Sequence, residues 1–154
     1  MKKIKSIYNS ILVENKKFNT KLISAFPGSG KSHFFKTSNK KVLDSDSSTF
    51  DKKDFPSNYI KHIKEKMGTV DYILISSHKD VRDALKENNL NYTLVYPNKE
   101  LKEDYLKRYK ERGSPKSFIE LLKNNWDSWV DEMNNESFPK TKKLKKDQYL
   151  SDII

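Results

Sequence analysis

Residues 22–32 read L-I-S-A-F-P-G-S-G-K-S, and this stretch decides how the rest of the chain is interpreted. Its first five residues are mostly apolar, which is typical of a buried strand. A strand that runs through a glycine-rich loop into a helix is the layout of a phosphate-binding loop. The usual pattern is G-x-x-x-x-G-K-[ST]. Ala25 stands in place of the first glycine, whereas Gly30, Lys31 and Ser32 match the pattern.

The loop residues suit a nucleoside triphosphate. Gly28 and Gly30 lack a Cβ atom, so the backbone can adopt left-handed angles and turn its N–H groups toward a phosphate. The helix that follows adds its positive dipole end. The lysine of such a loop reaches the β- and γ-phosphates, and the next hydroxyl suits a Mg²⁺ ligand. The predicted nucleotide-binding segment is Pro27, Gly28, Ser29, Gly30, Lys31, Ser32 and His33. The alternative is an ordinary strand–turn–helix with an incidental lysine.

The composition excludes several classes of site. With 154 residues and no cysteine, we expect one domain without disulfides, thiolate metal sites or cysteine nucleophiles. No apolar run approaches the length of a membrane span or a signal peptide, so we expect a cytoplasmic protein without a membrane partner. The formal net charge of +10 comes almost entirely from lysine. An anionic substrate is a sufficient partner for this positive charge, although a nucleic-acid partner stays open.

Hydrophobic periodicity predicts an α/β domain over residues 1–154. We expect strands at about 21–26, 41–43, 70–76 and 92–96, with a weaker fifth near 143–145. Helices are expected within 1–20, 31–37, 59–67, 79–87, 99–111 and 118–133, the last with Trp126 and Trp129 in the core. Strands that alternate with helices form a parallel sheet of about five strands, covered by helices on both faces. Such sheets bind ligands at the carboxyl ends of their strands.

Two carboxylates follow the second predicted strand, in the sequence Asp44-Ser45-Asp46. Residues two apart in an extended segment point the same way, so both carboxylates can face the phosphate loop. One is suited to binding Mg²⁺, and the other is suited to accepting the proton of an acceptor hydroxyl or to orienting it. The strongest apolar strand ends in serines and His78 and offers no carboxylate there. A solvated polar turn is the alternative interpretation of the two aspartates.

The segments A-F-P-G-S-G-K-S and V-L-D-S-D together resemble the small P-loop kinases. The nearest parallels are shikimate and gluconate kinases and the 5′-end kinases of polynucleotide kinase type. The chain also resembles short phage and bacterial proteins described as nucleoside or nucleotide kinases. The resemblance implies a P-loop NTPase domain of the nucleoside monophosphate kinase and shikimate kinase type. It also implies that Lys31 is catalytic, that Ser32 and Asp44 hold the metal, that Asp46 activates the acceptor, and that adenine lies near residues 146–149.

Kinases of this type also carry arginines on a lid that closes over the transferring phosphates. Arg108 and Arg112 lie four apart on one predicted helix face, directly before Gly113-Ser114-Pro115. We therefore expect a lid at about 107–117 with both arginines catalytic; a solvated charged helix face is the alternative. Arg82 and, more weakly supported, His78 follow the third strand and are candidates for acceptor binding.

These features predict an ATP-dependent, Mg²⁺-requiring phosphotransferase of nucleotide metabolism. Its acceptor is expected to be a hydroxyl or phosphate of a nucleoside or nucleotide. One alternative is a nucleic-acid-binding P-loop ATPase, with the lysine-rich segment 140–154 as its footprint. A kinase acting on the 5′-hydroxyl of a polynucleotide is the other.

Overall fold

The computed structural model describes residues 19–154, which form an α/β fold around one parallel sheet. The strands are β1 (Lys21–Ala25), β2 (Val42–Asp44), β3 (Tyr72–Ser76), β4 (Thr93–Pro97) and β5 (Lys140–Leu144). Their order across the sheet is β2-β3-β1-β4-β5. The predicted five-stranded parallel sheet is therefore confirmed.

Helices connect the strands and lie close to their predicted ranges, apart from a short helix at 150–153 that follows the last strand and was not predicted. The α-helices are α2 (Lys31–Thr37), α3 (Ser57–Lys66), α4 (Lys79–Glu87), α5 (Lys102–Glu111), α6 (Lys116–Asn134) and α7 (Leu150–Ile153). Short 3₁₀ turns η1 (Ser47–Thr49) and η2 (Lys99–Leu101) precede α3 and α5. The helix expected within residues 1–20 lies almost wholly outside the described residues. No helix within 19–154 has both the length and the apolar composition needed to cross a membrane.

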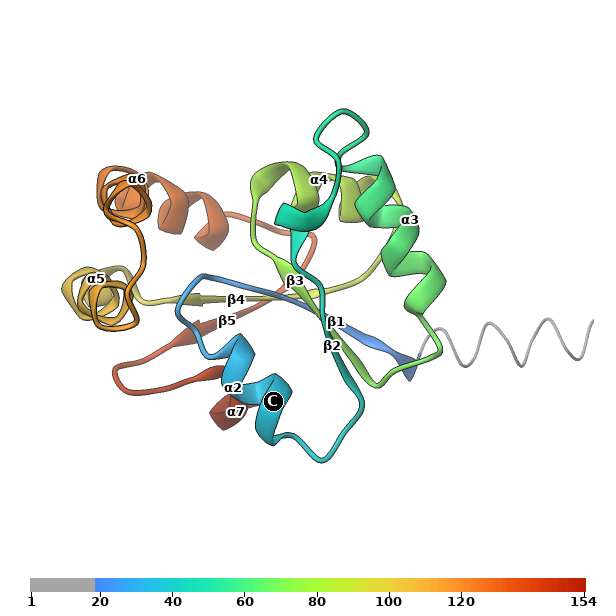
Figure 1. Ribbon diagram of the computed structural model, residues 1–154, viewed down its shortest axis with the longest axis horizontal. Helices are drawn as coiled ribbons and strands as arrows, with labels where there is room; N and C mark the ends of the chain where they lie inside the picture. The colour runs from blue at the N-terminus through green and yellow to red at the C-terminus, as the bar shows by residue number, and fades with distance from the viewer. Residues whose placement is uncertain (1–18) are drawn as a thin grey trace, which may run out of the picture.

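Alternate residues of the central strands enter two cores, one on each face of the sheet. Leu22 and Ile73 face the larger core, whereas their neighbours Ile23 and Leu74 face the smaller one. Figure 1 shows α3 and α4 over one face and α2 and α7 over the other. Trp126 of α6 is fully buried in the larger core, where its indole N–H donates to the carbonyl of Lys99 (2.8 Å). The predicted core position of Trp126 is confirmed, and the half-buried Trp129 packs against the same cluster.

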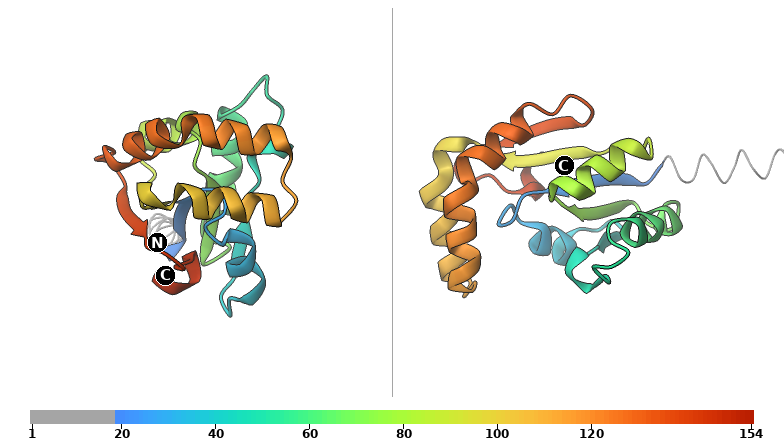
Figure 2. Two further views of the ribbon diagram at one scale, coloured as in Figure 1. Left: turned by 90° about the vertical axis from the view of Figure 1, so that its left-hand side faces the viewer. Right: turned by 90° about the horizontal axis from the view of Figure 1, so that it is seen from above.

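The helices α5 and α6 occupy a special position. Figure 2 shows them side by side, across the edge of the sheet toward which the strands of Figure 1 point. This is the edge at which β1 leads into residues 26–30 and β2 leads into Asp44 and Asp46. The chain passes from one side of β1 to the other between β3 and β4, and open sheets of this kind bind ligands beside such a reversal.

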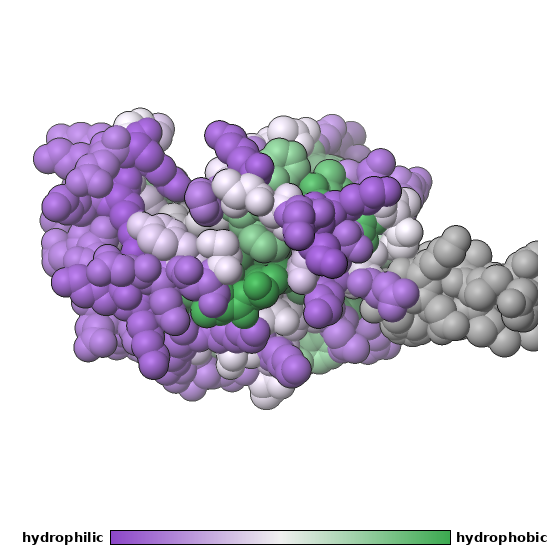
Figure 3. Space-filling model, turned by 90° about the horizontal axis from the view of Figure 1, so that it is seen from below, coloured by the Kyte–Doolittle hydropathy of each residue, from purple (hydrophilic) through white to green (hydrophobic). Residues whose placement is uncertain are grey.

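The face seen from below in Figure 3 is mostly hydrophilic around a small apolar area. A notch separates the hydrophilic lobe of α5 and α6 from the rest of this face, which places an opening at the carboxyl edge of the sheet.

Candidate functional site

A cleft of about 1170 Å³ opens at the carboxyl edge of the sheet. Its lining comes from the loop after β1, the ends of β2 and β3, the facing ends of α5 and α6, and the segment that leads into α7. These residues are Pro27, Gly28, Gly30, Lys31, Ser32, His33, Asp44, Ser45, Asp46, Ser76, Arg108, Glu111, Arg112, Phe118, Asp147, Tyr149, Ser151 and Asp152. The structure thus brings the predicted loop and the predicted carboxylates to one cleft.

Every backbone carbonyl of residues 26–30 accepts a hydrogen bond from another group of the protein. The carbonyl of Phe26 accepts from Ser29, and that of Gly30 accepts from the N–H of Phe34 (3.0 Å). The carbonyls of the three intervening residues accept from more distant parts of the chain. Pro27 accepts from the Tyr109 hydroxyl (2.6 Å), and Gly28 accepts from the Arg108 guanidinium (2.9 Å). Ser29 accepts from the N–H of Leu150 (2.8 Å).

Two N–H groups of the same loop are left for a ligand, whereas those of Phe26 and Ser29 donate to the carbonyls of Val95 and Phe26. Within residues 19–154, the N–H groups of Gly28 and Gly30 donate to no protein acceptor. Both glycines have positive φ angles, of 84° and 98°, which alternate with ordinary angles to form a concave row of N–H groups. The first N–H groups of α2 continue this row, because the first turn of a helix lacks intrahelical acceptors. The arrangement suits a bound anion.

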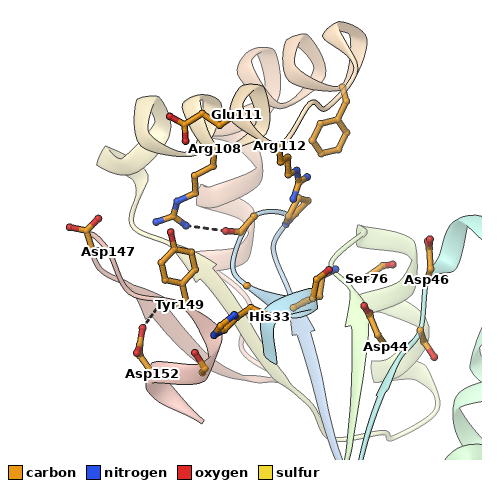
Figure 4. A pocket seen from close by; sticks show the side chains of 18 residues that line it. His33, Asp44, Asp46, Ser76, Arg108, Glu111, Arg112, Asp147, Tyr149 and Asp152 are labelled. Atoms are coloured by element: carbon orange, nitrogen blue, oxygen red, sulfur yellow. Dashed lines mark hydrogen bonds between the residues drawn. The ribbon is translucent and has the colours of Figure 1, made fainter. Parts of the chain in front are cut away.

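Helix α5 packs directly on this loop. A Cβ atom added at Gly28 would lie 2.8 Å from a ring carbon of Tyr109, so only glycine fits between the loop and the helix. The Arg108 guanidinium lies between two rings, 4.3 Å from the centroid of Tyr105 and 4.4 Å from that of Tyr149. These contacts position the loop from above, as the dashed hydrogen bond of Arg108 in Figure 4 shows.

Tyr149 completes the loop's surroundings from the opposite side. A Cβ atom at Gly30 would lie 3.2 Å from both Cβ and Cδ1 of Tyr149, which is tighter than ordinary packing. The N–H of Tyr149 donates to Asp152 (2.8 Å), which fixes the start of α7. Figure 4 shows Arg108, Asp147, Tyr149 and Asp152 at one end of the cleft.

Lys31 lies between the loop and the carboxylates. Burial lowers its pKa from the usual value, the charges of Asp44 and Asp46 oppose this shift, and the charge of Arg112 adds to it. A ligand that brings further negative charge would stabilise the charged form of a lysine in these surroundings.

The opposite end of the cleft is acidic and rich in hydroxyls. Asp44 ends β2, and Figure 4 shows it near Ser76 and Asp46. The Asp46 carboxylate accepts a hydrogen bond from the N–H of Ser48 (2.9 Å). Hydrogen bonding to Ser48 is the main cause of the lowered pKa of Asp46. Asp46 is therefore held as a carboxylate that faces the cleft.

Buried side chains fix this acidic end from behind. The hydroxyl of Tyr59 donates to the carbonyl of Ser45 (2.8 Å) and accepts from the N–H of Ser76 (3.4 Å), so it joins the ends of β2 and β3. Burial raises the pKa of Tyr59 to about 12, which keeps this hydroxyl a donor. Ser47 and Ser76 also share a hydrogen bond (2.7 Å).

Arg82 and His78, predicted to bind an acceptor, do not line the cleft. Arg82 is only 2% exposed, and its guanidinium pairs with Glu132 of α6 (2.5 Å) and with Glu136, just after that helix. It also donates to the carbonyl of Ser77 (2.9 Å). Arg82 therefore joins α4 to α6, and the prediction that it contacts a ligand is wrong. His78 precedes α4 as an exposed residue whose side chain does not cap the helix.

The two predicted lid arginines differ in their surroundings. Arg108 donates to the carbonyl of Gly28, and its guanidinium lies between the rings of Tyr105 and Tyr149. Arg112 is exposed at the end of α5, and its Nε donates to the Ser114 hydroxyl (2.9 Å). Within the described residues Arg112 has no ion pair. Its guanidinium also lies 5.0 Å from the Tyr109 ring and 5.7 Å from the Phe118 ring. Arg112 is the more exposed of the two arginines and therefore the one better placed to meet an anionic ligand.

Ser32 and Asp44 are the oxygen donors of the cleft best suited to a divalent cation. Both are exposed, and in the described part of the chain neither side chain makes a hydrogen bond or ion pair. No group of three or more histidine or acidic side chains able to hold a metal occurs in residues 19–154. This donor set fits Mg²⁺ bound mainly through phosphates and water, since Mg²⁺ commonly takes few protein ligands.

No protein-family model, curated protein sequence or solved structure matches the chain. The function is therefore argued from the cleft itself.

Several residues that support or line the cleft were not predicted from the sequence. Tyr105 and Tyr109 repeat at helical spacing, which marks a buried face but not a contact with a loop more than 70 residues earlier. Tyr149 lies at the end of the segment that the kinase resemblance assigns to adenine, but its stacking on Arg108 was not predicted. Phe118 packs against the larger core and also lines the cleft, which was not predicted.

Proposed function

We propose that the protein is an ATP-dependent, Mg²⁺-requiring phosphotransferase of the small P-loop kinase type, acting on a nucleoside or nucleotide. The observation that carries the proposal is the loop of residues 26–30, whose carbonyls are all bonded to the protein while the N–H groups of Gly28 and Gly30 stay unpaired. Two free loop N–H groups that lead into the start of a helix, beside a half-buried lysine, suit the binding of phosphates.

The contents of the cleft support an orientation for ATP. Its β- and γ-phosphates would lie on the loop beside Lys31. The adenosine would extend toward Tyr149, at the end of the cleft where Figure 4 shows Arg108 and Asp147. The γ-phosphate would then point toward Asp44 and Asp46, at the other end. This orientation leaves the acidic end for the acceptor.

The chain's own residues supply the main catalytic effects. Lys31 and Arg112 neutralise the charge that spreads over the transferring phosphoryl group. The Asp46 carboxylate orients the attacking acceptor and receives its proton, since its lowered pKa keeps it ionised. Ser32 and Asp44 would hold Mg²⁺, which neutralises phosphate charge when bound.

A transfer assay tests this proposal. Purified protein is given Mg²⁺ and ATP labelled at the γ-phosphate, with nucleosides, nucleoside monophosphates, 5′-hydroxyl oligonucleotides and small hydroxy acids as acceptors. We expect labelled product from wild type and from Lys36→Ala, an exposed α2 residue outside the cleft. Lys31→Ala and Asp46→Asn should each lower transfer by about a hundredfold or more.

The result also separates the alternatives. Transfer to oligonucleotides alone would identify a polynucleotide 5′-hydroxyl kinase. Phosphate release only with DNA or RNA, and no transfer, would contradict the proposal and indicate a nucleic-acid-dependent ATPase. The affinity of such an ATPase should fall steeply with salt.

A further inference from the structure

The cations of the cleft all lie toward one of its ends, and this bears on the identity of the acceptor. The loop side holds Lys31, Arg108 and Arg112 together with the carboxylates Glu111, Asp147 and Asp152, whereas the ends of β2 and β3 contribute Asp44, Ser45, Asp46 and Ser76 and no cation. Figure 4 shows Asp44, Asp46 and Ser76 together, on the far side of the loop from Tyr149. An acceptor that approaches the γ-phosphate from this end meets carboxylates and hydroxyls.

From this division we propose that the acceptor presents a hydroxyl group, and not a phosphate group, at the acidic end of the cleft. This inference rests on the proposed phosphotransferase function and narrows its substrate class. A monophosphate carries about two negative charges at neutral pH, and it would have to lie beside Asp44 and Asp46. Like charges brought together in a binding site strongly reduce affinity.

Among the described residues, the acidic side contributes no cation of its own to offset this repulsion, and Lys31 of the loop side is the cation within electrostatic reach of the two aspartates. Within residues 19–154, no lysine or arginine of β2, η1, α3, β3 or α4 lines the cleft. Arg82 is the arginine nearest in sequence to the end of β3, and its guanidinium is buried against Glu132 and Glu136. The residue type that most often binds a phosphate acceptor is therefore withdrawn from the cleft.

Arg112 does not take over this role, because its charge acts on the loop side. It lowers the pKa of Lys31, which shows that the two cations lie within electrostatic reach of each other. Both are needed there for the phosphates of ATP. Its guanidinium also lies 5.7 Å from the Phe118 ring, which gives this wall of the cleft an aromatic surface suited to a flat, uncharged part of an acceptor.

The reaction then balances as follows. The acceptor oxygen forms a bond to the γ-phosphorus, and the bond from that phosphorus to the β,γ-bridging oxygen breaks. ADP leaves with the electron pair, and the hydroxyl proton passes to the Asp46 carboxylate and then to water. A free nucleoside and the 5′-hydroxyl end of a polynucleotide share this chemistry.

Matched acceptors test the inference. Each deoxynucleoside, its 5′-monophosphate and a 5′-hydroxyl oligothymidylate are offered with γ-labelled ATP, and the products are separated. We expect kcat/KM for a hydroxyl acceptor to exceed that for the matching monophosphate by about a hundredfold or more. Label on the free nucleoside or on the oligonucleotide supports the inference and tells the two sources apart. Nucleoside diphosphate formed from the monophosphate at a comparable rate would overturn it and leave the proposed phosphotransferase intact.

A binding measurement gives a readout that does not depend on turnover. Deoxythymidine monophosphate is titrated into protein saturated with a non-hydrolysable ATP analogue. Asp46→Asn should tighten its binding by about tenfold, because one repelling charge is removed. Asp54→Asn is the matched control, since Asp54 is an exposed carboxylate outside the cleft, and it should change nothing. Equal binding by wild type and Asp46→Asn would contradict the inference. Transfer to no acceptor at all would contradict the proposed function, and this inference with it.

Discussion

At the scale of single residues, the site depends on how Lys31 is held. Burial disfavours its charge, and the two aspartates favour it. Bound phosphates would add to the aspartates and raise the pKa of the ammonium again. ATP binding should therefore favour the protonated form of Lys31, and protonation of Lys31 should favour ATP binding.

This balance predicts a pH dependence of ATP binding. The pKa of Lys31 in the free protein lies below the usual 10.5, so its charge is lost earlier than that of an exposed lysine as pH rises. As pH rises, ATP affinity should therefore begin to fall at a lower pH than it would with an exposed lysine, with proton uptake on binding, since the bound form favours the ammonium. Calorimetry in buffers of different ionisation enthalpy measures this uptake. Lys31→Arg should bind without it; uptake that persists in this variant would assign the effect elsewhere.

The two arginines of α5 should differ in what their removal affects. Arg112→Ala should lower kcat by about a hundredfold with ATP affinity less affected, because this side chain is free to meet charge that develops during transfer. Arg108→Ala should instead weaken ATP binding, because it removes the bond that holds the carbonyl of Gly28. Steady-state kinetics together with ATP titrations separate the two effects. Identical changes in both variants would contradict this division of roles.

Arg82 shows where prediction at the residue scale ends. The sequence places it shortly after a strand, where acceptor-binding residues are common, and nothing local indicates burial. Its partners lie 50 and 54 residues later, on α6 and just after it. Only the packing of α4 against α6 decides that this charge is structural. The loop and the Asp44–Asp46 pair were predictable, because local spacing and strand direction determine both.

At the scale of elements, the contact between α5 and the phosphate loop is decisive. Tyr105 and Tyr109 lie one turn apart on α5 and are both fully buried. The Tyr109 hydroxyl donates to Pro27, whereas the buried Tyr105 hydroxyl has no hydrogen-bond partner among the described residues. The same chemical change at these neighbouring positions should have opposite consequences.

Tyr109→Phe should destabilise the protein by about 1–2 kcal/mol and weaken ATP binding, because the carbonyl of Pro27 loses its donor. Tyr105→Phe is the matched control and should be neutral or slightly stabilising, because it removes an unpaired buried hydroxyl. Urea unfolding followed by fluorescence measures both. A larger loss from Tyr105→Phe than from Tyr109→Phe would show that α5 does not hold the loop in this way.

The ion pairs between α4 and α6 carry a stability prediction of their own. Arg82→Met should destabilise the protein by about 2–3 kcal/mol, since it leaves two partly buried glutamates without their partner. The exposed pair of Lys79 and Asp83 is the control, and Lys79→Met should have little effect. ATP affinity should stay the same in folded Arg82→Met, because Arg82 lies outside the cleft. A large loss of ATP affinity without a loss of stability would return Arg82 to the site.

At the scale of the whole molecule, the sheet determines where chemistry can occur. Parallel strands bring the ends of β1, β2 and β3 to one edge, which is why the glycine loop and the aspartates meet. The alternation of strands and helices predicted this arrangement. The last strand was less predictable: β5 reads K-T-K-K-L, and a lysine-rich edge strand gives little hydrophobic signal. The coverage of the loop by α5 and α7 also depends on long-range packing.

The central claim is that the loop of residues 26–32 binds the phosphates of a nucleotide. Calorimetric titration of ATP, ADP, AMP and adenosine into wild type, Lys31→Ala and the control Lys36→Ala tests it most directly. We predict that affinity rises with each added phosphate, that Lys31→Ala lowers ATP affinity by about tenfold or more, and that Lys36→Ala leaves it unchanged. Equal binding of ATP by wild type and Lys31→Ala, or of adenosine and ATP by wild type, would contradict the claim.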